Sequence, residues 1–192
     1  MSASSDPRPG AVGSPATGLG AKILGGAAAF LLLLLAIGFL LPSRWEASAS
    51  ALVPASADEV FPLLDAPEGW RRWTTWPDSG VVREGPDRGA GASMAWSNAD
   101  VGSGRFTIEE AVPHQRVRYV VNVNEGAMRT EGTLTLRAER GGVRVEWHEE
   151  GDLGRNPLMG YWGLFMEEAQ AAELAKGLDR LAALVSDSAR TR

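Results

Sequence analysis

The stretch AAELAKGLDRLAALV, residues 171–185, carries a single apolar stripe at helical spacing. Its apolar side chains recur every three or four residues, and charged residues fill positions between them. The stripe consists of Ala171, Leu174, Leu178, Leu181 and Val185. Such spacing puts these side chains on one face of an α-helix, and that face requires an apolar surface to pack against. We therefore predict a long amphipathic helix that begins near Pro157.

The surface that this helix needs is predicted upstream, where the hydrophobic pattern has a period of two. Apolar and polar side chains alternate in segments between residues 94 and 147, as in strands with one buried face. The apolar positions are Met94, Trp96, Phe106, Ile108, Val117, Tyr119, Val121, Val123, Leu134, Leu136, Val143, Val145 and Trp147. The links between the segments, such as the turn at Gly141 and Gly142, are too short for crossover helices. The segments are therefore predicted to form an antiparallel sheet, and Trp45–Val53 is expected to add another strand.

A helix-start signal follows this first strand. Ser56 stands three residues before Glu59, which is the spacing of a capping box, where two side chains satisfy free backbone amides of the first turn. Pro62 follows within the next turn and lacks the amide hydrogen that a continuing α-helix needs. We predict a short or kinked helix at this point.

One apolar sheet face and one apolar helix face must meet, so we predict an α+β domain with a single core. A chain of about 150 residues is the usual size for one domain. We place its boundaries at 43–188, with 189–192 as a tail. Residues 1–20 are mostly Pro, Gly, Ser and Ala, and they are predicted to be a disordered tail because they have little apolar surface to bury.

The segment between the tail and the domain has the length and composition of a membrane span. Ile23–Leu41 has no charged or polar side chain, and a helix of that length covers roughly 28 Å, close to the hydrocarbon thickness of a bilayer. We predict a transmembrane helix over residues 21–42, with residues 23–41 in the membrane. A cleaved signal peptide is the alternative, because residues 47–49 form an A-x-A pattern. Cleavage there would remove half of the first predicted strand.

The basic residues around this segment indicate its orientation. Arg8 and Lys22 precede it, and only Arg44 follows closely, which favours a cytoplasmic N-terminus. We therefore predict a single-pass membrane protein whose domain lies outside the cytoplasm.

Composition excludes several classes of function. The chain has 24 acidic and 19 basic residues and a net charge of −5, which is unfavourable for binding nucleic acid. It has no cysteine, so thiol nucleophiles and thiolate metal sites are excluded, and its two histidines, His114 and His148, stand in no metal-binding motif. Glu149 and Glu150 point to opposite faces of an extended strand and cannot share one ion. We predict no nucleic-acid partner, no metal, no cofactor and no catalytic residue.

Five phrases of the sequence, taken in order, carry a family resemblance. They are LPSRWEASASALVPASADEVFPLL (41–64), TTWP (74–77) after Trp70 and Trp73, EEAVPHQRVRY (109–119), WHEEGDLG (147–154) and GLFMEEAQAAELAKGLDRLAALV (163–185). Together they resemble the START-like (SRPBCC) superfamily of the polyketide cyclase/dehydrase type, over about residues 42–186. The resemblance implies a helix-grip fold, in which a curved antiparallel sheet wraps around the long C-terminal helix. In many relatives the space between them holds a lipid, sterol or polyketide, and a subset of relatives has one N-terminal span that ends in LPS.

The resemblance and the strand pattern together give the candidate cavity lining. These residues are Trp73, Trp76, Met94, Trp96, Phe106, Ile108, Tyr119, Val121, Leu134, Val145, Trp147, Glu149, Trp162, Phe165, Leu174 and Leu178. Glu149 shares the inward parity of Trp147, so it is expected to present a polar group at the cavity rim. The alternative for the tryptophans is that they only fill the core.

Glycines in the C-terminal segment suggest two further features. Gly160 and Gly163 weaken the helix around Tyr161 and Trp162, and we predict that residues 156–166 form a mobile gate. Gly177 lies inside the long helix without a capping role, which indicates either a close approach of the sheet or room for a ligand.

Three functions remain open from the sequence. The first is a membrane-tethered module that binds a hydrophobic small molecule or lipid. The second is a scaffold whose own side chains fill the cavity, and the third is an enzyme of the cyclase or hydrolase kind. We favour the binding module. A cavity of useful volume would distinguish it from the scaffold, and an ionisable group pointing inward would favour the enzyme.

Overall fold

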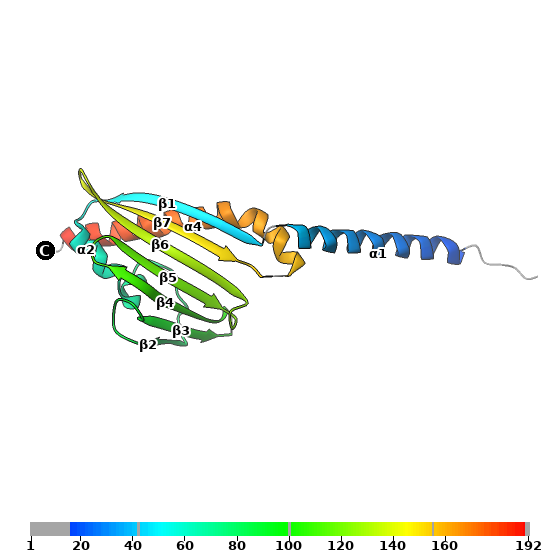
Figure 1. Ribbon diagram of the computed structural model, residues 1–192, viewed down its shortest axis with the longest axis horizontal. Helices are drawn as coiled ribbons and strands as arrows, with labels where there is room; N and C mark the ends of the chain where they lie inside the picture. The colour runs from blue at the N-terminus through cyan, green and yellow to red at the C-terminus, as the bar shows by residue number, and fades with distance from the viewer. Residues whose placement is uncertain (1–15, 42, 100, 155, 191–192) are drawn as a thin grey trace, which may run out of the picture.

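The fold is one seven-stranded antiparallel sheet with a long helix across its apolar face (Figure 1). The computed structural model describes residues 16–41, 43–99, 101–154 and 156–190. The helices are α1 (Ala16–Leu40), α2 (Ala57–Val60), the 3₁₀ helix η1 (Phe61–Leu63), α3 (Pro67–Trp70) and α4 (Pro157–Arg190). The strands are β1 (Arg44–Val53), β2 (Val81–Glu84), β3 (Ser93–Asn98), β4 (Gly102–Val112), β5 (Arg116–Val123), β6 (Met128–Glu139) and β7 (Gly142–Asp152). The predicted α+β helix-grip fold is confirmed.

The strand order reflects the short turns between β2 and β7 and the pairing of the first strand with the last. The order is β1-β7-β6-β5-β4-β3-β2, so each strand from β2 to β7 pairs with its neighbour in sequence and β1 joins the far edge. The pairing of β1 with β7 runs from Arg44 opposite Asp152 to Val53 opposite Val143. This arrangement brings β1 beside α4, which packs closely against it.

The core forms where the apolar stripe of α4 meets the inward side chains of the sheet. Leu174, Leu178, Leu181 and Val185 of the predicted stripe are buried, and Ala171 is partly buried. The sheet contributes Val53, Ile108, Val117, Leu134, Leu136, Val143 and Val145, which are all buried. The two apolar faces inferred from the sequence therefore pack against each other, as predicted.

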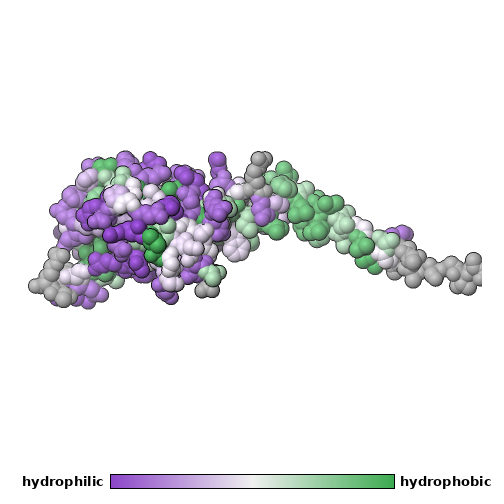
Figure 2. Space-filling model, turned by 90° about the horizontal axis from the view of Figure 1, so that it is seen from below, coloured by the Kyte–Doolittle hydropathy of each residue, from purple (hydrophilic) through white to green (hydrophobic). Residues whose placement is uncertain are grey.

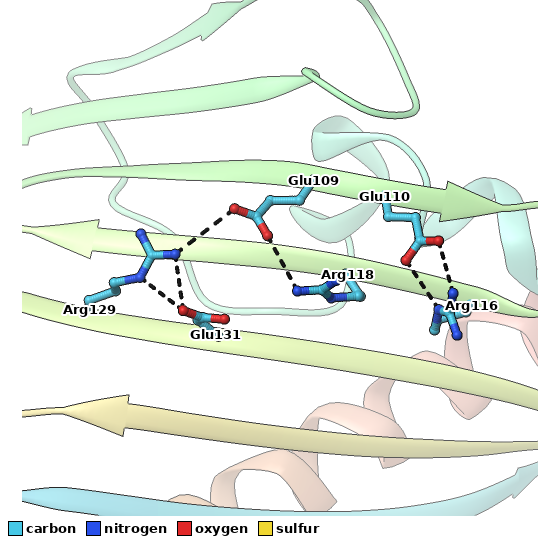
Figure 3. A network of polar contacts seen from close by, with 6 residues as sticks. All are labelled: Glu109, Glu110, Arg116, Arg118, Arg129 and Glu131. Atoms are coloured by element: carbon cyan, nitrogen blue, oxygen red, sulfur yellow. Dashed lines mark hydrogen bonds and ion pairs between the residues drawn. The ribbon is translucent and has the colours of Figure 1, made fainter.

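The opposite face of the sheet carries a lattice of ion pairs (Figure 3). Its members, on β4, β5 and β6, are Glu109, Glu110, Arg116, Arg118, Arg129 and Glu131. Arg116 Nη2 lies 2.8 Å from Glu110 Oε1, and Arg129 Nη2 lies 3.0 Å from Glu131 Oε1. Exposed pairs of this kind stabilise a fold only slightly, by about 0–1 kcal/mol each. Their position shows which side of the sheet faces solvent, so the candidate site must lie on the other side.

The short helices after β1 agree with the capping signal and with the proline. The Ser56 amide and hydroxyl both donate to Glu59 Oε2, at 3.1 Å each. Pro62 lies within η1, which replaces the α-helix after one turn, so the predicted short helix is confirmed. Helix α3 and strand β2 were not predicted, because each has only four residues and no clear hydrophobic period.

Helix α1 is almost entirely apolar and projects away from the domain (Figure 1). Within the described residues, Gly20–Leu40 is the helix long and apolar enough to cross a membrane, although a signal sequence near an N-terminus has the same properties. Figure 2 shows apolar residues gathered along this helix, whereas the domain surface in that view is mostly hydrophilic. The structure therefore contains the apolar helix that was predicted.

Two boundaries differ from the prediction. Residues 16–20, assigned to the disordered tail, belong to α1, and α4 extends beyond residue 188 to Arg190. Residues 1–15, 42 and 191–192, on which parts of the tail and span predictions fall, lie outside the described residues.

Helix α4 runs without interruption through the glycines at its start. A Cβ atom on Gly160 would lie 2.5 Å from the carbonyl oxygen of Gly38, so this glycine permits close packing of α4 against α1. That contact is a structural reason for Gly160. The mobile gate over residues 156–166 stays a prediction.

Candidate ligand-binding cavity

A cavity of about 470 Å³ lies between the sheet and α4. Its lining residues are Trp70, Thr74, Thr75, Trp76, Pro77, Trp96, Val101, Phe106, Tyr119, Val121, Val123, Trp147, Glu149, Gln170, Glu173, Leu174 and Arg180. Most of the lining is apolar and aromatic, and the volume falls in the range of roughly 300–1,000 Å³ typical of small-molecule sites. The helix-grip therefore leaves space that its own side chains do not fill.

Aromatic rings form one wall of the cavity. The Trp76 ring packs edge-on against Trp96 and Phe106, at centroid distances of 5.9 and 5.8 Å. Trp76 Nε1 donates to Thr74 Oγ1 at 2.8 Å, and Thr74 Oγ1 donates to the Trp70 carbonyl oxygen at 2.8 Å. These bonds satisfy the indole N–H of Trp76 and the hydroxyl of Thr74, so the Trp76 ring can face an apolar space.

A buried polar cluster lies within this apolar lining. Trp147 Nε1 donates to the Tyr119 hydroxyl at 2.8 Å, and that hydroxyl donates to Glu149 Oε1. Gln170 Nε2, from α4, donates to Glu149 Oε2 at 2.6 Å. Glu149 is only 5% exposed. The cluster therefore joins β5, β7 and α4 through one buried carboxyl group.

Local backbone geometry explains how Tyr119 reaches this position. Gly132 stands opposite Tyr119 in the pairing of β5 with β6. A Cβ atom on Gly132 would lie 2.1 Å from Tyr119 Cζ, so the absence of a side chain lets the phenol ring lie across β6. The ring then points its hydroxyl toward β7, where Glu149 and Trp147 are inward neighbours.

Burial changes the acidity of both members of the central pair. Burial raises the pKa of Glu149, while the hydrogen bonds from Tyr119 and Gln170 oppose that change. The pKa of Tyr119 is raised well above its usual value, first by burial and then by the neighbouring Glu149 carboxylate. Tyr119 is therefore a protonated donor at physiological pH, and Glu149 holds its proton to a higher pH than an exposed glutamate.

The structure brings half of the predicted lining residues together around the cavity. These are Trp76, Trp96, Phe106, Tyr119, Val121, Trp147, Glu149 and Leu174. Trp73, Met94, Ile108, Leu134, Val145 and Leu178 are instead buried in the core and are not among the lining residues. Trp73 Nε1 donates to the Leu63 carbonyl oxygen at 3.2 Å, which fixes its ring under η1. The core-filling alternative therefore describes this tryptophan.

Two predicted lining residues lie outside the cavity, and their assignment is corrected. Trp162 is 60% exposed and Phe165 is 74% exposed, on the first turns of α4. Phe165 precedes Leu174 by nine residues, or about two and a half turns, which places it on the opposite face of the helix. The helical spacing already indicated that Phe165 lies on the outer face of α4. The prediction was wrong because it gave more weight to aromatic character than to this spacing.

Sequence reasoning missed several cavity residues, of which Gln170 and Trp70 are the most informative. Gln170 lies one turn before Leu174 on the inward stripe, so the period could have identified it. Trp70 belongs to the tryptophan series, and its Nε1 donates to the Leu64 carbonyl oxygen at 2.6 Å. Val101, in the turn between β3 and β4, carries no periodic signal, because turn residues lie outside any regular pattern.

Gly177 permits the close approach of an indole ring to α4. A Cβ atom at this position would lie 2.8 Å from Trp147 Cζ3 and 3.7 Å from Trp73 Cζ3. Of the two explanations predicted for this glycine, the structure supports close approach of the sheet. The Trp147 ring in turn holds the Tyr119 hydroxyl, so the glycine contributes to the geometry of the polar cluster.

Solved structures with the same fold are numerous, and three illustrate the range. An uncharacterised protein from Rhizobium leguminosarum is 21% identical, with a TM-score of 0.55, over 75% of this chain and 95% of that one. A protein from Thermus thermophilus is 20% identical, with a TM-score of 0.57, over 74% and 98%. One half of StfQ, a di-domain ARO/CYC protein from the steffimycin biosynthetic pathway, is 14% identical, with a TM-score of 0.56, over 76% of this chain and 52% of StfQ. At these identities the similarity establishes the fold.

Sequence comparison identifies the family. No curated protein matches the chain. The profile of the family described as polyketide cyclase/dehydrase and lipid transport matches residues 44–186, which is nearly all of the domain. The chain therefore belongs to the polyketide cyclase/dehydrase and lipid transport family, a membership that supports a module for binding hydrophobic ligands.

Proposed function

We propose that the domain binds a lipid-like small molecule in the cavity and that α1 anchors it to a membrane. The observation that carries the proposal is an apolar cavity of about 470 Å³ whose lining includes one buried polar cluster. Apolar lining supplies affinity, whereas a few placed polar groups orient the ligand. The unfilled volume favours this function over a scaffold with a filled core.

The polar cluster indicates the kind of group that the ligand presents. The Tyr119 proton is already donated to Glu149, and both Glu149 oxygens accept hydrogen bonds. Each carboxylate oxygen has a second lone pair, so the cluster has spare acceptors and no spare hydroxyl proton. A ligand with a hydroxyl group on an otherwise apolar body would satisfy one of these acceptors.

Native mass spectrometry of the full chain, released from detergent, tests ligand binding. The wild-type protein is expected to carry an apolar adduct of defined mass. Val121→Trp fills part of the cavity and should abolish the adduct. Val82→Trp places the same side chain on an exposed position of β2 and should retain it. An adduct that persists unchanged in Val121→Trp, or that is absent from the wild-type protein, would refute the proposal.

The membrane part of the proposal rests on α1. Gly20–Leu40 is long enough to span, and its side chains are largely exposed in the structure. With the cytoplasmic N-terminus favoured by the basic residues, the domain lies outside the cytoplasm. Protease added to intact cells should then digest the domain, whereas protection of the domain until the cells are lysed would reverse the orientation.

An enzyme is the second candidate, because an ionisable group does point into the cavity. A buried carboxyl group with a raised pKa, in contact with a tyrosine, has the properties of a general acid or base. Glu149→Gln distinguishes the two functions. In a binding module the variant releases the same molecule as the wild-type protein, whereas in an enzyme it accumulates a molecule of different mass that the wild-type protein converts.

A further inference from the structure

The first turns of α4 present an apolar face that the domain does not cover. Leu158 and Trp162 are each 60% exposed, and Phe165 is 74% exposed. They stand at positions i, i+4 and i+7, so they lie on one side of the helix. The sequence from Asn156 to Met166 contains no charged residue, and the charges resume at Glu167. A surface helix in water normally places polar residues on such a face.

The start of α4 lies beside the C-terminal part of α1 (Figure 1). The Tyr161 hydroxyl donates to the Leu34 carbonyl oxygen at 2.6 Å. Gly38 and Gly160 allow the two backbones to approach, since a Cβ atom on Gly38 would lie 2.2 Å from the Pro157 carbonyl oxygen. The start of α4 is therefore packed directly on the helix that we propose as the anchor.

The depth of this contact follows from helix geometry. Leu34 precedes the last residue of α1, Leu40, by six residues, or about 9 Å at 1.5 Å per residue. A side chain that reaches the Leu34 carbonyl group thus enters the part of the bilayer that α1 occupies. Aromatic residues such as tryptophan are enriched at the boundary between acyl chains and headgroups.

We propose that Pro157–Phe165 is a second membrane-contacting element, with Leu158, Trp162 and Phe165 in the outer part of the lipid bilayer. This inference rests on the proposed anchoring by α1 and identifies the lipid surface itself as the partner of the exposed face. The direct packing of the start of α4 on α1 supports this inference. The sequence also changes from apolar to charged at similar places, at Glu167 on α4 and at Arg44 after α1.

The arrangement also places the cavity close to lipid. Gln170, a cavity residue, follows Phe165 by five residues, or about 8 Å along the helix. The turn between β3 and β4, which supplies Val101 to the lining, lies at the end of the sheet nearest α1 (Figure 1). An apolar ligand therefore has a short path between the bilayer and the cavity.

The absence of cysteine from the sequence makes a direct test simple. Single cysteines replace Phe165, Leu33 and Lys176 in the full chain, and each carries the same fluorophore. All three side chains are exposed, so labelling should leave the fold intact. The labelled proteins are reconstituted in phosphatidylcholine vesicles that contain lipids with a nitroxide quencher either near the headgroup or deep in the acyl chain.

The expected result is several-fold stronger quenching of the Phe165→Cys label than of the Lys176→Cys label, with the headgroup-level quencher the more effective. The Leu33→Cys label should respond to the deep quencher. Quenching of Leu33→Cys together with equal, weak quenching at the other two positions would overturn the inference and leave the anchor intact. An unquenched Leu33→Cys label would overturn the anchor itself, and the inference with it.

Discussion

The effect of Gly177→Ala on the free energy of unfolding should change sign with the size of the ring at position 147. In an unobstructed helix, alanine in place of glycine stabilises the fold by about 1 kcal/mol. Here the added Cβ atom would lie 2.8 Å from Trp147 Cζ3, closer than van der Waals contact allows. Displacing a packed side chain costs about 1–3 kcal/mol. The net expectation is a loss of about 1 kcal/mol of unfolding free energy.

The Trp147 ring cannot move freely to relieve this contact. Its Nε1 donates to the Tyr119 hydroxyl, and its ring packs edge-on against Trp73 at a centroid distance of 5.3 Å. In a Trp147→Phe background the outer ring atoms are absent. Gly177→Ala should then stabilise the protein by about 1 kcal/mol, the full helix-propensity gain.

Urea unfolding of the full chain in a mild detergent, followed by tryptophan fluorescence, measures all four members of this cycle. Ala175→Gly is the matched control, because Ala175 is exposed on the same helix and should cost about 1 kcal/mol in both backgrounds. The steric account fails if Gly177→Ala stabilises the protein equally with tryptophan and with phenylalanine at position 147.

Three other perturbations test different parts of the structure. The raised pKa of Glu149 means that the folded state holds this proton more tightly than the unfolded state, so unfolding free energy should fall as the pH rises from about 4.5 through the raised value. Glu149→Gln should remove that slope and Glu150→Gln should keep it; identical slopes would contradict the assignment. Asp65 is buried, its Oδ1 has no hydrogen-bond partner within the described residues, and burial raises its pKa, while Arg88, which lies 3.8 Å from Oδ2, opposes that change. Asp65→Asn should therefore raise the Tm more at pH 7 than at pH 4, and thermal unfolding at the two pH values measures the difference. Gly160→Leu should separate α4 from α1, because even a Cβ atom at this position would lie 2.5 Å from the Gly38 carbonyl oxygen. The distribution of distances between spin labels on the two helices should then broaden, and an unchanged distribution would contradict this expectation.

The main elements of the fold were predictable because each has a clear hydrophobic period. The stripe from Leu174 to Val185 and the alternation from Val143 to Trp147 each leave one consistent set of inward side chains. Parity also placed Glu149 inward and Glu150 outward, as the structure confirms. Short elements such as β2 gave no such signal, because four residues are too few for a period to emerge.

The cavity itself was harder to predict, because parity assigns a side chain to a face and does not say how far away the opposing surface lies. Val145 and Val121 both point inward from the sheet, yet Val145 is fully buried and Val121 lines the cavity. The difference depends on the spacing between α4 and each strand, which is a property of the assembled fold. Hydrogen bonds between distant residues, such as Gln170 to Glu149, depend on the same spacing.

The contact between Tyr161 and Leu34 also restricts how the domain can turn. Helix α1 ends at Leu40 and β1 begins at Arg44, so the connecting chain is short, and the hydrogen bond from Tyr161 adds a second point of attachment. These two attachments, the short link and the packing of Tyr161 on α1, oppose rotation of the domain relative to α1. Under the proposed anchoring by α1, the domain would keep one tilt relative to the bilayer plane while the whole molecule rotates about the membrane normal, so the same side of the domain would always face the lipid.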